Sequence, residues 1–146
     1  MFQEITITPA TIADRSEIVA LLQSQKLPTE DLPSPLENFI VVKENGKVIG
    51  SVGIQLYGKY ALLRSLAVDS AHQGNGLGKA LYKAAIELAS NKKVQELFLI
   101  TTTADPFFKK LGFLQIDRKA VPAPIQASAQ FSSICPASST VMSKKL

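Results

Sequence analysis

The alternation of apolar and polar residues predicts a chain built from both strands and helices. Segments with a period of two, or a continuous apolar run, indicate strands over Gln3–Thr8, Phe39–Lys43, Val48–Leu56, Tyr60–Val68, Glu96–Thr101, Leu114–Arg118 and Thr140–Lys144. Segments with helical periodicity indicate helices over Arg15–Gln25, Leu77–Ala89 and Asp105–Leu111, with another short one starting at Pro124. We therefore expect one mixed α/β domain over residues 1–146, with helices on both faces of its sheet.

Local signals refine this pattern. Asp14, with Glu17 three residues later, has the spacing of a capping box at the start of the first helix. Asn45-Gly46 is typical of a two-residue hairpin turn. The longest helix connects the strands Tyr60–Val68 and Glu96–Thr101, so these two strands should be parallel.

A glycine-rich turn precedes the longest helix. Gly74, Gly76 and Gly78 occupy alternate positions directly before and within the first helical turn. The first N–H groups of a helix have no intrahelical acceptor, and glycine lets a ligand approach the backbone closely. The helix dipole adds partial positive charge at the same place. The turn therefore predicts a cradle for a phosphate or diphosphate group.

Composition and charge narrow the range of functions. The net charge is +4, but the lysines are dispersed, which favours a small anionic ligand over a nucleic acid. No apolar run approaches the roughly 20 residues of a membrane span. The N-terminal residues lack the pattern of a signal segment. The single cysteine, Cys135, excludes an internal disulfide, so we expect a cytoplasmic protein.

Two common phosphate-binding motifs do not fit the glycine turn. A dinucleotide-binding G-x-G-x-x-G motif that starts at Gly74 would need a glycine where Lys79 stands. A Walker A motif that ends at Gly78-Lys79 would need a hydroxyl residue where Ala80 stands, and a glycine where Gln73 stands. The turn must therefore belong to another class.

Two segments resemble the signatures of the GCN5-related N-acetyltransferase superfamily. The first is Q-x-x-G-x-G, formed by Gln73, Gly76 and Gly78 after a strand that ends in L-A-V. The second is A-D-P-F-F-K-K-L-G-F over Ala104–Phe113. The resemblance covers essentially the whole chain. It implies a mostly antiparallel sheet of about six to seven strands with one splayed parallel pair, and acetyl-coenzyme A as cofactor; it implies no metal.

The resemblance also implies roles for particular residues. Backbone N–H groups of the glycine turn would bind the diphosphate, and the L-A-V strand end would pair with the pantetheine arm. A bulge near Leu66–Val68 would direct a backbone N–H, from Leu66 or Val68, at the thioester carbonyl. The implied cofactor-binding residues are Leu66, Ala67, Val68, Gln73, Gly74, Asn75, Gly76, Leu77, Gly78, Lys79, Phe107 and Phe108.

The chain departs from the superfamily where many members place an acid. Those members have a tyrosine four residues before the glycine of the second signature, to protonate the leaving thiolate. Here the glycine is Gly112, which we expect to end the short helix, and Phe108 stands at the tyrosine position. Phenylalanine has no proton to give. Water, Thr101–Thr103, Ser65 and Cys135 remain alternatives for the acid, and departure of the thiolate without an acid is a further alternative.

A second departure concerns the acceptor. Many members carry a glutamate on the strand before L-A-V, where this chain has Arg64 and Ser65. An arginine on an apolar strand is either paired structurally or points into the cleft, where it could grip an acidic substrate. The general base is also open between Glu30, Asp31, Glu37 and water. The candidate acceptor-binding residues are Arg64, Ser65, Glu30 and Thr102, and the only histidine, His72, is expected to be a turn or surface residue.

A narrower resemblance is to the ArsN-type acetyltransferases associated with bacterial arsenic resistance. It is carried by Leu27–Leu32, Leu62–Val68, Thr101–Ala104 and Ser132–Ser138. It implies acetylation of an amino-acid-like arsenical or phosphinate in detoxification. Acetylation of an ordinary amino acid or a peptide N-terminus, or coenzyme A binding without turnover, are the alternatives. Because the superfamily often dimerises, the resemblance also allows a homodimer.

Overall fold

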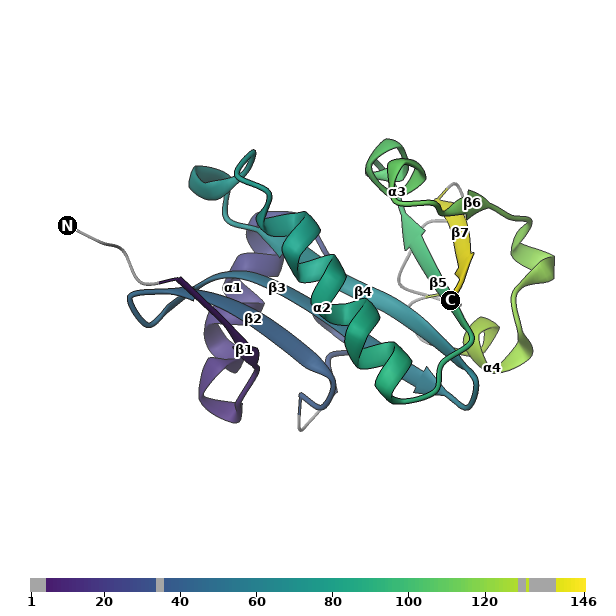
Figure 1. Cartoon of the computed structure of the whole chain (residues 1–146), viewed down its shortest axis with the longest axis horizontal. Helices are drawn as coiled ribbons and strands as arrows, with labels where there is room; N and C mark the ends of the chain where they lie inside the picture. The colour runs from purple at the N-terminus through teal and green to yellow at the C-terminus, as the bar shows by residue number, and fades with distance from the viewer. Residues whose placement is uncertain (1–4, 34–35, 129–130, 132–138) are drawn as a thin grey trace.

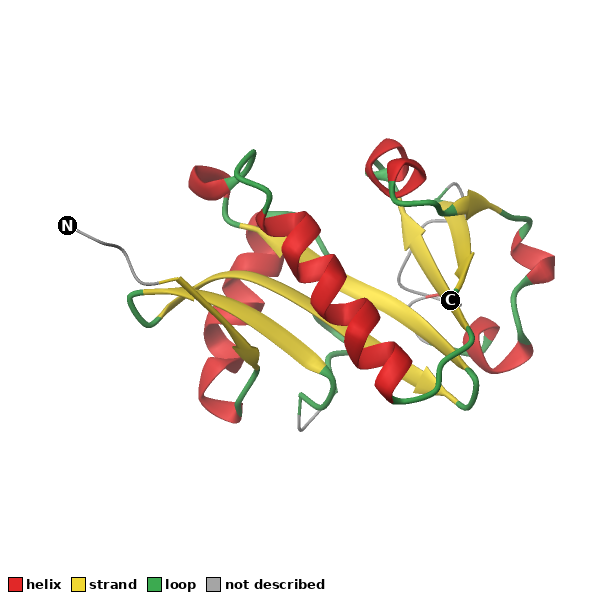
Figure 2. Cartoon of the chain, viewed as in Figure 1, coloured by secondary structure: helices red, strands yellow, loops and turns green. Residues whose placement is uncertain are grey.

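A computed structural model describes residues 5–33, 36–128, 131 and 139–146. Within these residues seven strands form one sheet in the order β1-β2-β3-β4-β5-β7-β6 (Figure 1). The strands are β1 Ile5–Pro9, β2 Phe39–Glu44, β3 Lys47–Tyr57, β4 Tyr60–Val68, β5 Glu96–Thr101, β6 Leu114–Gln115 and β7 Thr140–Lys145. The helices are α1 Arg15–Ser24, α2 Leu77–Asn91, α3 Asp105–Lys110 and α4 Ala123–Gln126 (Figure 2). None of the helices in this part of the chain is long and apolar enough to span a membrane.

Helices cover both faces of the sheet, as the sequence predicts. Figure 1 shows α2 in front of β2, β3 and β4, with α1 behind them. Leu81, Ala85 and Ala89 of α2 are buried in a core with Val42 of β2. On the opposite face, the apolar stripe of α1 packs on a second core that contains Val41. Val41 and Val42 point to opposite faces because successive strand residues alternate.

The β2–β3 hairpin closes as predicted. Asn45 and Gly46 both adopt left-handed conformations, with φ of 52° and 83°. Two consecutive residues with positive φ define the turn that matches the twist of a two-residue hairpin. This turn sets the register that places Glu44 opposite Lys47.

The parallel pair is short, and its strands then diverge. β4 and β5 pair in parallel only where Tyr60–Leu62 meets Glu96–Phe98. Beyond that point β5 continues to pair with β7, whereas β4 continues to pair with β3. The carboxyl halves of β4 and β5 therefore splay apart, which confirms the prediction and leaves a gap in the middle of the sheet.

A bulge in β4 lies beside this gap. Ser51 pairs with Ala67 and Gly53 with Arg64, so Ser65 and Leu66 together oppose one β3 residue. Ser65 has a left-handed φ of 58°, and its carbonyl accepts a hydrogen bond of 2.8 Å from the Ser51 hydroxyl. The predicted bulge is present, and it begins at Ser65.

Two local predictions were wrong. The strand expected over Leu114–Arg118 ends at Gln115, because the Asp117 side chain accepts a hydrogen bond from the Lys119 N–H and turns the chain into a short 3₁₀ helix. The capping box is formed by Thr11 and Asp14.

Asp14 does not cap α1 because its carboxylate is already engaged. It accepts a hydrogen bond of 2.8 Å from the Thr11 N–H and pairs with Lys43 at 2.9 Å. Burial alone would raise the pKa of Asp14, but the hydrogen bonds from Thr11 and Lys43 together hold that pKa below its ordinary value. Asp14 therefore joins the first turn to β2.

Candidate active site

The glycine turn forms an open cradle at the start of α2. Gly74 and Gly76 adopt left-handed conformations, with φ of 86° and 79°, and a Cβ at either position would meet open space. Gly76 is the N-cap of α2, and no side chain caps the helix. The N–H groups of the first helical turn therefore lack an intrahelical acceptor and are available to a ligand.

A cavity of about 540 Å³ opens over this cradle. It extends from the end of β4 across the start of α2 to α3. All of the residues predicted to bind the cofactor line it, except Asn75. Phe107 closes one side, and its ring lies 3.6 Å from where a Cβ on Gly78 would be. We refer to this space as the donor cavity.

The end of β4 is tied to the turn by two glutamines. The Val68 carbonyl accepts hydrogen bonds from the side-chain amides of Gln73, at 2.9 Å, and Gln25, at 3.2 Å. The first glutamine of the predicted signature thus holds the turn against the strand. Since both lone pairs of the Val68 carbonyl are engaged, a pantetheine arm would have to pair with other backbone groups of β4.

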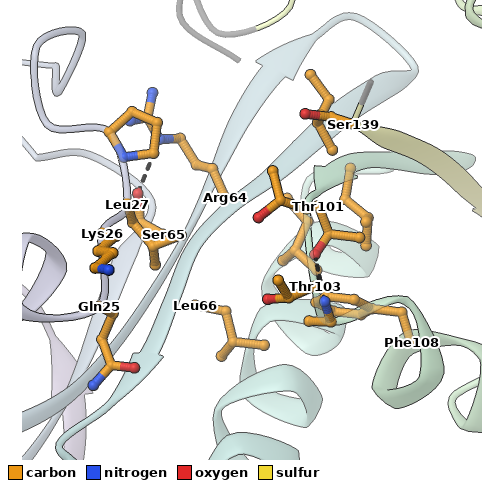
Figure 3. Close-up of a pocket in the computed structure, with 16 residues that line it drawn as sticks. Gln25, Lys26, Leu27, Arg64, Ser65, Leu66, Thr101, Thr103, Phe108 and Ser139 are labelled. Atoms are coloured by element: carbon orange, nitrogen blue, oxygen red, sulfur yellow. Dashed lines mark hydrogen bonds between the residues drawn. The ribbon is translucent and has the colours of Figure 1, made fainter. Parts of the chain in front are cut away.

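A second cavity, of about 520 Å³, fills the gap between the splayed strands, and we refer to it as the acceptor cavity. Figure 3 shows Arg64, Ser65 and Leu66 of β4 on one side of it, with Thr101, Thr103 and Ser139 on the other. Four residues line both cavities: Gln25, Leu66, Ala104 and Phe108. The two spaces therefore adjoin at the bulge of β4.

Arg64 is fully engaged by its neighbours. Its side chain is completely buried and forms two hydrogen bonds with the Asp31 carboxylate, at 2.6 and 2.8 Å. Arg64 donates two more hydrogen bonds, to the side-chain amide oxygen of Gln55, at 3.1 Å, and to the Ser65 hydroxyl, at 3.0 Å. Of the two interpretations that the sequence leaves open, this geometry favours the structural ion pair.

The comparisons with known proteins agree with this geometry. The model of the Acetyltransferase (GNAT) family matches residues 9–113. The chain belongs to this family. It is also 31% identical over 124 residues to an uncharacterized N-acetyltransferase of Chlorobaculum tepidum, with 80% of this chain and 79% of the relative covered.

More distant relatives share part of their length with this acetyltransferase. It is 31% identical over 81 residues to an amino-acid acetyltransferase of Mycobacterium tuberculosis, covering 55% of this chain and 46% of that protein. N-acetylglutamate synthase from Neisseria gonorrhoeae, solved with coenzyme A and N-acetyl-glutamate, superposes with a TM-score of 0.85 at 19% identity. That match covers 100% of this chain and 36% of the synthase, and it shows a shared fold.

The acetyltransferase has an apolar wall at the position where the resemblance led us to look for an acid. Phe108 is buried, lines both cavities and packs edge-on against Phe107 and Phe113, with centroids 5.1 and 5.6 Å apart. The Thr101 hydroxyl accepts the Ala104 N–H at 2.9 Å, which starts the turn into α3. Cys135 lies outside the described residues.

The predicted acceptor residues do not all meet. Ser65 and Thr102 line the acceptor cavity, together with Arg64. Glu30 is exposed and lines neither cavity, whereas its neighbour Asp31 turns inward to Arg64. The structure thus separates two adjacent acidic residues that the sequence could not distinguish.

Two residues of the acceptor cavity were missed. The Ser139 hydroxyl is buried with no hydrogen-bond partner among the described residues, and it lines the cavity. Its position in a run of small residues carries no sequence signal. Lys26 lines the same cavity with a left-handed φ of 59°. Lys26 follows the end of α1, and the next N–H, that of Leu27, donates a hydrogen bond to the Leu22 carbonyl. Glycine is the residue most often found at the left-handed position of such a helix end.

His72 is more than a turn residue. It lines the donor cavity, and its two ring nitrogens lie 3.0 Å from an Asp69 oxygen and 3.1 Å from a Glu44 oxygen. The hydrogen bonds to Asp69 and Glu44 raise the pKa of His72 above its ordinary value. The sequence singles out this histidine only because it is the sole one.

Proposed function

We propose that this protein transfers an acetyl group from acetyl-coenzyme A to the primary amine of a small, acidic, amino-acid-like acceptor. The observation that carries the proposal is the junction of the two cavities at Leu66. A thioester that enters from the donor cavity and an amine that enters from the acceptor cavity would meet beside the β4 bulge.

The donor cavity suits coenzyme A because backbone N–H groups form part of its polar surface. Uncapped N–H groups at the start of α2 would bind the diphosphate, and Gly74 and Gly76 leave room for it. Lys79, on the cavity wall, adds positive charge. Phe107 would cover the pantetheine arm. Acetyl-coenzyme A supplies the activated acyl group, and the chain positions it.

The bulge gives β4 a means of polarising the thioester. With β5 diverging, backbone N–H groups near Leu66 and Val68 have no partner strand on that side. We propose that one of them donates a hydrogen bond to the thioester carbonyl. A preorganised donor of this kind is typically worth about 3–4 kcal/mol in the transition state. The amine would then form the new C–N bond as the C–S bond breaks, and its proton would pass by way of water to the departing thiolate, which leaves as free coenzyme A.

The acceptor cavity supports an acceptor with a carboxylate. Lys26 forms no ion pair with any described residue, so the cavity carries an uncompensated positive charge at its edge. The Ser139 hydroxyl, which is buried with no hydrogen-bond partner among the described residues, would donate to an oxygen of the acceptor. We propose that Lys26 and Ser139 bind the acid group, while Arg64 and Ser65 form the wall behind it. Thr102 lies at the edge of the same surface.

The proposal also concerns which second acid group the acceptor carries. The resemblance to arsenic-resistance acetyltransferases favours an arsenical or phosphinic amino acid. The N-acetyl-glutamate bound to the gonococcal synthase favours an ordinary acidic amino acid. These acceptors share a carboxylate, an amine and a second acid group, and they differ only in the last of these.

A panel of amines tests the proposal. Release of free thiol from acetyl-coenzyme A would be measured with acidic and neutral amino acids, phosphinic and arsenical amino acids, a peptide and a polyamine. We expect turnover with the acidic amino acids and none with the polyamine, which Lys26 would repel. Coenzyme A binding without thiol release for any amine would instead indicate a sensor, a role that Phe108 at the acid position would fit.

A further inference from the structure

His72 joins three parts of the donor site. It ends the short 3₁₀ helix Ser70–His72 between β4 and the glycine turn, and it lines the donor cavity. Asp69, which directly follows β4, donates its N–H to the Ile49 carbonyl of β3. Glu44 ends β2 beside the hairpin. The His72 ring lies between the Asp69 and Glu44 carboxylates, and so links the cradle to the sheet.

The hydrogen bonds determine the charge of this ring. A carboxylate oxygen only accepts hydrogen bonds, and a neutral imidazole has one donor nitrogen and one acceptor nitrogen. Both ring nitrogens of His72 face carboxylate oxygens, at 3.0 and 3.1 Å, so when both carboxyl groups are ionised each ring nitrogen must carry a proton to donate. The ring in this arrangement is an imidazolium ion.

We propose that the His72 imidazolium is a positioning residue for the donor, because it neutralises carboxylate charge beside the cradle that binds the diphosphate. The proposal rests on the proposed function and deepens it. With the ring charged, the cluster of Glu44, Asp69 and His72 has a net charge of −1. Without the ring proton, it has a net charge of −2.

The other charged groups near the cluster do not replace this proton. Lys79 lines the donor cavity from the first turn of α2, and Lys47 lies opposite Glu44 in the hairpin register. Neither forms an ion pair with Glu44 or Asp69 in the described structure. Loss of the proton would leave a ring nitrogen lone pair facing a carboxylate. The link between the turn and the sheet would then open while the site becomes more negative.

The direction of the pH effect follows from the raised pKa of His72. The contribution of the ring is fully present below the ordinary histidine pKa of 6.5 and is lost as pH rises through the higher pKa of the folded protein. Binding of an anionic donor should raise that pKa further, because each equilibrium reinforces the other.

Calorimetry with dephospho-coenzyme A between pH 6 and pH 9 tests the proposal. This ligand keeps the diphosphate and lacks the phosphomonoester, whose own pKa of about 6 would obscure the result. We expect its dissociation constant to rise about three- to tenfold over this range in the wild type, with a smaller rise at high salt. His72→Gln should bind at every pH as the wild type binds at pH 9. S-acetylpantetheine, which has no diphosphate, should show no dependence on His72.

A spectroscopic measurement keeps the test independent of folding defects in variants. His72 is the only histidine, so its ring signals in nuclear magnetic resonance spectra of the untagged protein need no assignment. Both ring nitrogens should be protonated at pH 7, and dephospho-coenzyme A should move the titration midpoint upward. A flat binding profile, or an unmoved midpoint, overturns this inference alone. Failure to bind at any pH overturns the donor proposal as well.

Discussion

Arg64 and Asp31 form a two-point ion pair, with N–O distances of 2.6 and 2.8 Å, that ties the segment after α1 to the central strand β4. A second arginine, Arg15 of α1, holds the same segment by donating to the Pro33 carbonyl at 2.7 Å and the Leu32 carbonyl at 3.3 Å. The first residues of this segment, Gln25, Lys26, Leu27 and Pro28, line the acceptor cavity. The two arginines therefore hold the far end of a segment whose first residues line the cavity, Arg64 from the cavity wall itself and Arg15 from α1.

Removal of Arg64 should destabilise the protein strongly. Arg64→Ala leaves the Asp31 carboxylate largely buried without its partner, and such a loss typically costs about 3–5 kcal/mol. Arg15→Ala is the matched control, since it removes only bonds to carbonyls of the same segment and should cost less. Urea unfolding of both variants measures the difference. Wild-type stability for Arg64→Ala would contradict the structural importance of the pair.

The Asp31→Asn variant distinguishes two roles of Arg64: holding the cavity wall in place, or binding the acceptor directly. The substitution weakens the ion pair and frees part of the guanidinium. If Arg64 acts by holding the cavity wall, the acceptor KM should rise in Asp31→Asn, as in a folded Arg64→Lys variant. An acceptor KM that falls in Asp31→Asn would show instead that Arg64 competes for the substrate.

A methyl group at Gly76 should weaken donor binding. Gly76→Ala strains a left-handed residue by roughly 1–2 kcal/mol and places a side chain in the cradle. Gly58→Ala is the control, because Gly58 also has a left-handed φ, 66°, and also faces open space, but it lies in the β3–β4 turn. Both variants should lose similar stability. Only Gly76→Ala should raise the KM for acetyl-coenzyme A, by about tenfold.

Loss of the Ser139 hydroxyl should affect binding and spare stability. The hydroxyl is buried without a partner in the described structure, so Ser139→Ala removes no hydrogen bond there and should leave the melting temperature unchanged or slightly raised. The acceptor KM should rise several-fold, because the acceptor loses a donor. Ser143→Ala, at another buried serine that belongs to β7 and lines neither cavity, should leave KM unchanged. Equal KM values for all three proteins would exclude Ser139 from acceptor binding.

Lys26 should lower the stability of the protein and contribute to its specificity for acidic acceptors. Lys26→Gly relieves a left-handed conformation and should stabilise the protein by up to about 1 kcal/mol. Lys26→Gln keeps the backbone strain and removes the charge. Both should raise the KM for acidic acceptors and leave that for neutral amines unchanged. If Lys26→Gln discriminates between acidic and neutral amines as the wild type does, the charge has no role in recognition.

Much of the fold could be predicted because its causes are local. The strand period of two, the glycine turn before α2 and the Asn45-Gly46 hairpin depend on residues that are close in sequence. The same holds for the donor cradle, whose backbone groups follow directly from a helix that starts at a glycine. The β6 strand was predicted too long because a side-chain hydrogen bond at Asp117 ended it.

The side-chain contacts around both cavities depend on distant partners. Arg64 and Asp31 are 33 residues apart, and His72 and Glu44 are 28 apart. Alone, the chain determined that a glycine-rich turn opens the longest helix directly after a strand, because turn residues and residue period encode this locally. Only tertiary structure decided three further features: Arg64 pairs with Asp31, the Ser139 hydroxyl is buried with no partner among the described residues, and both ring nitrogens of His72 face carboxylates. These outcomes depend on which side chains the folded sheet brings together.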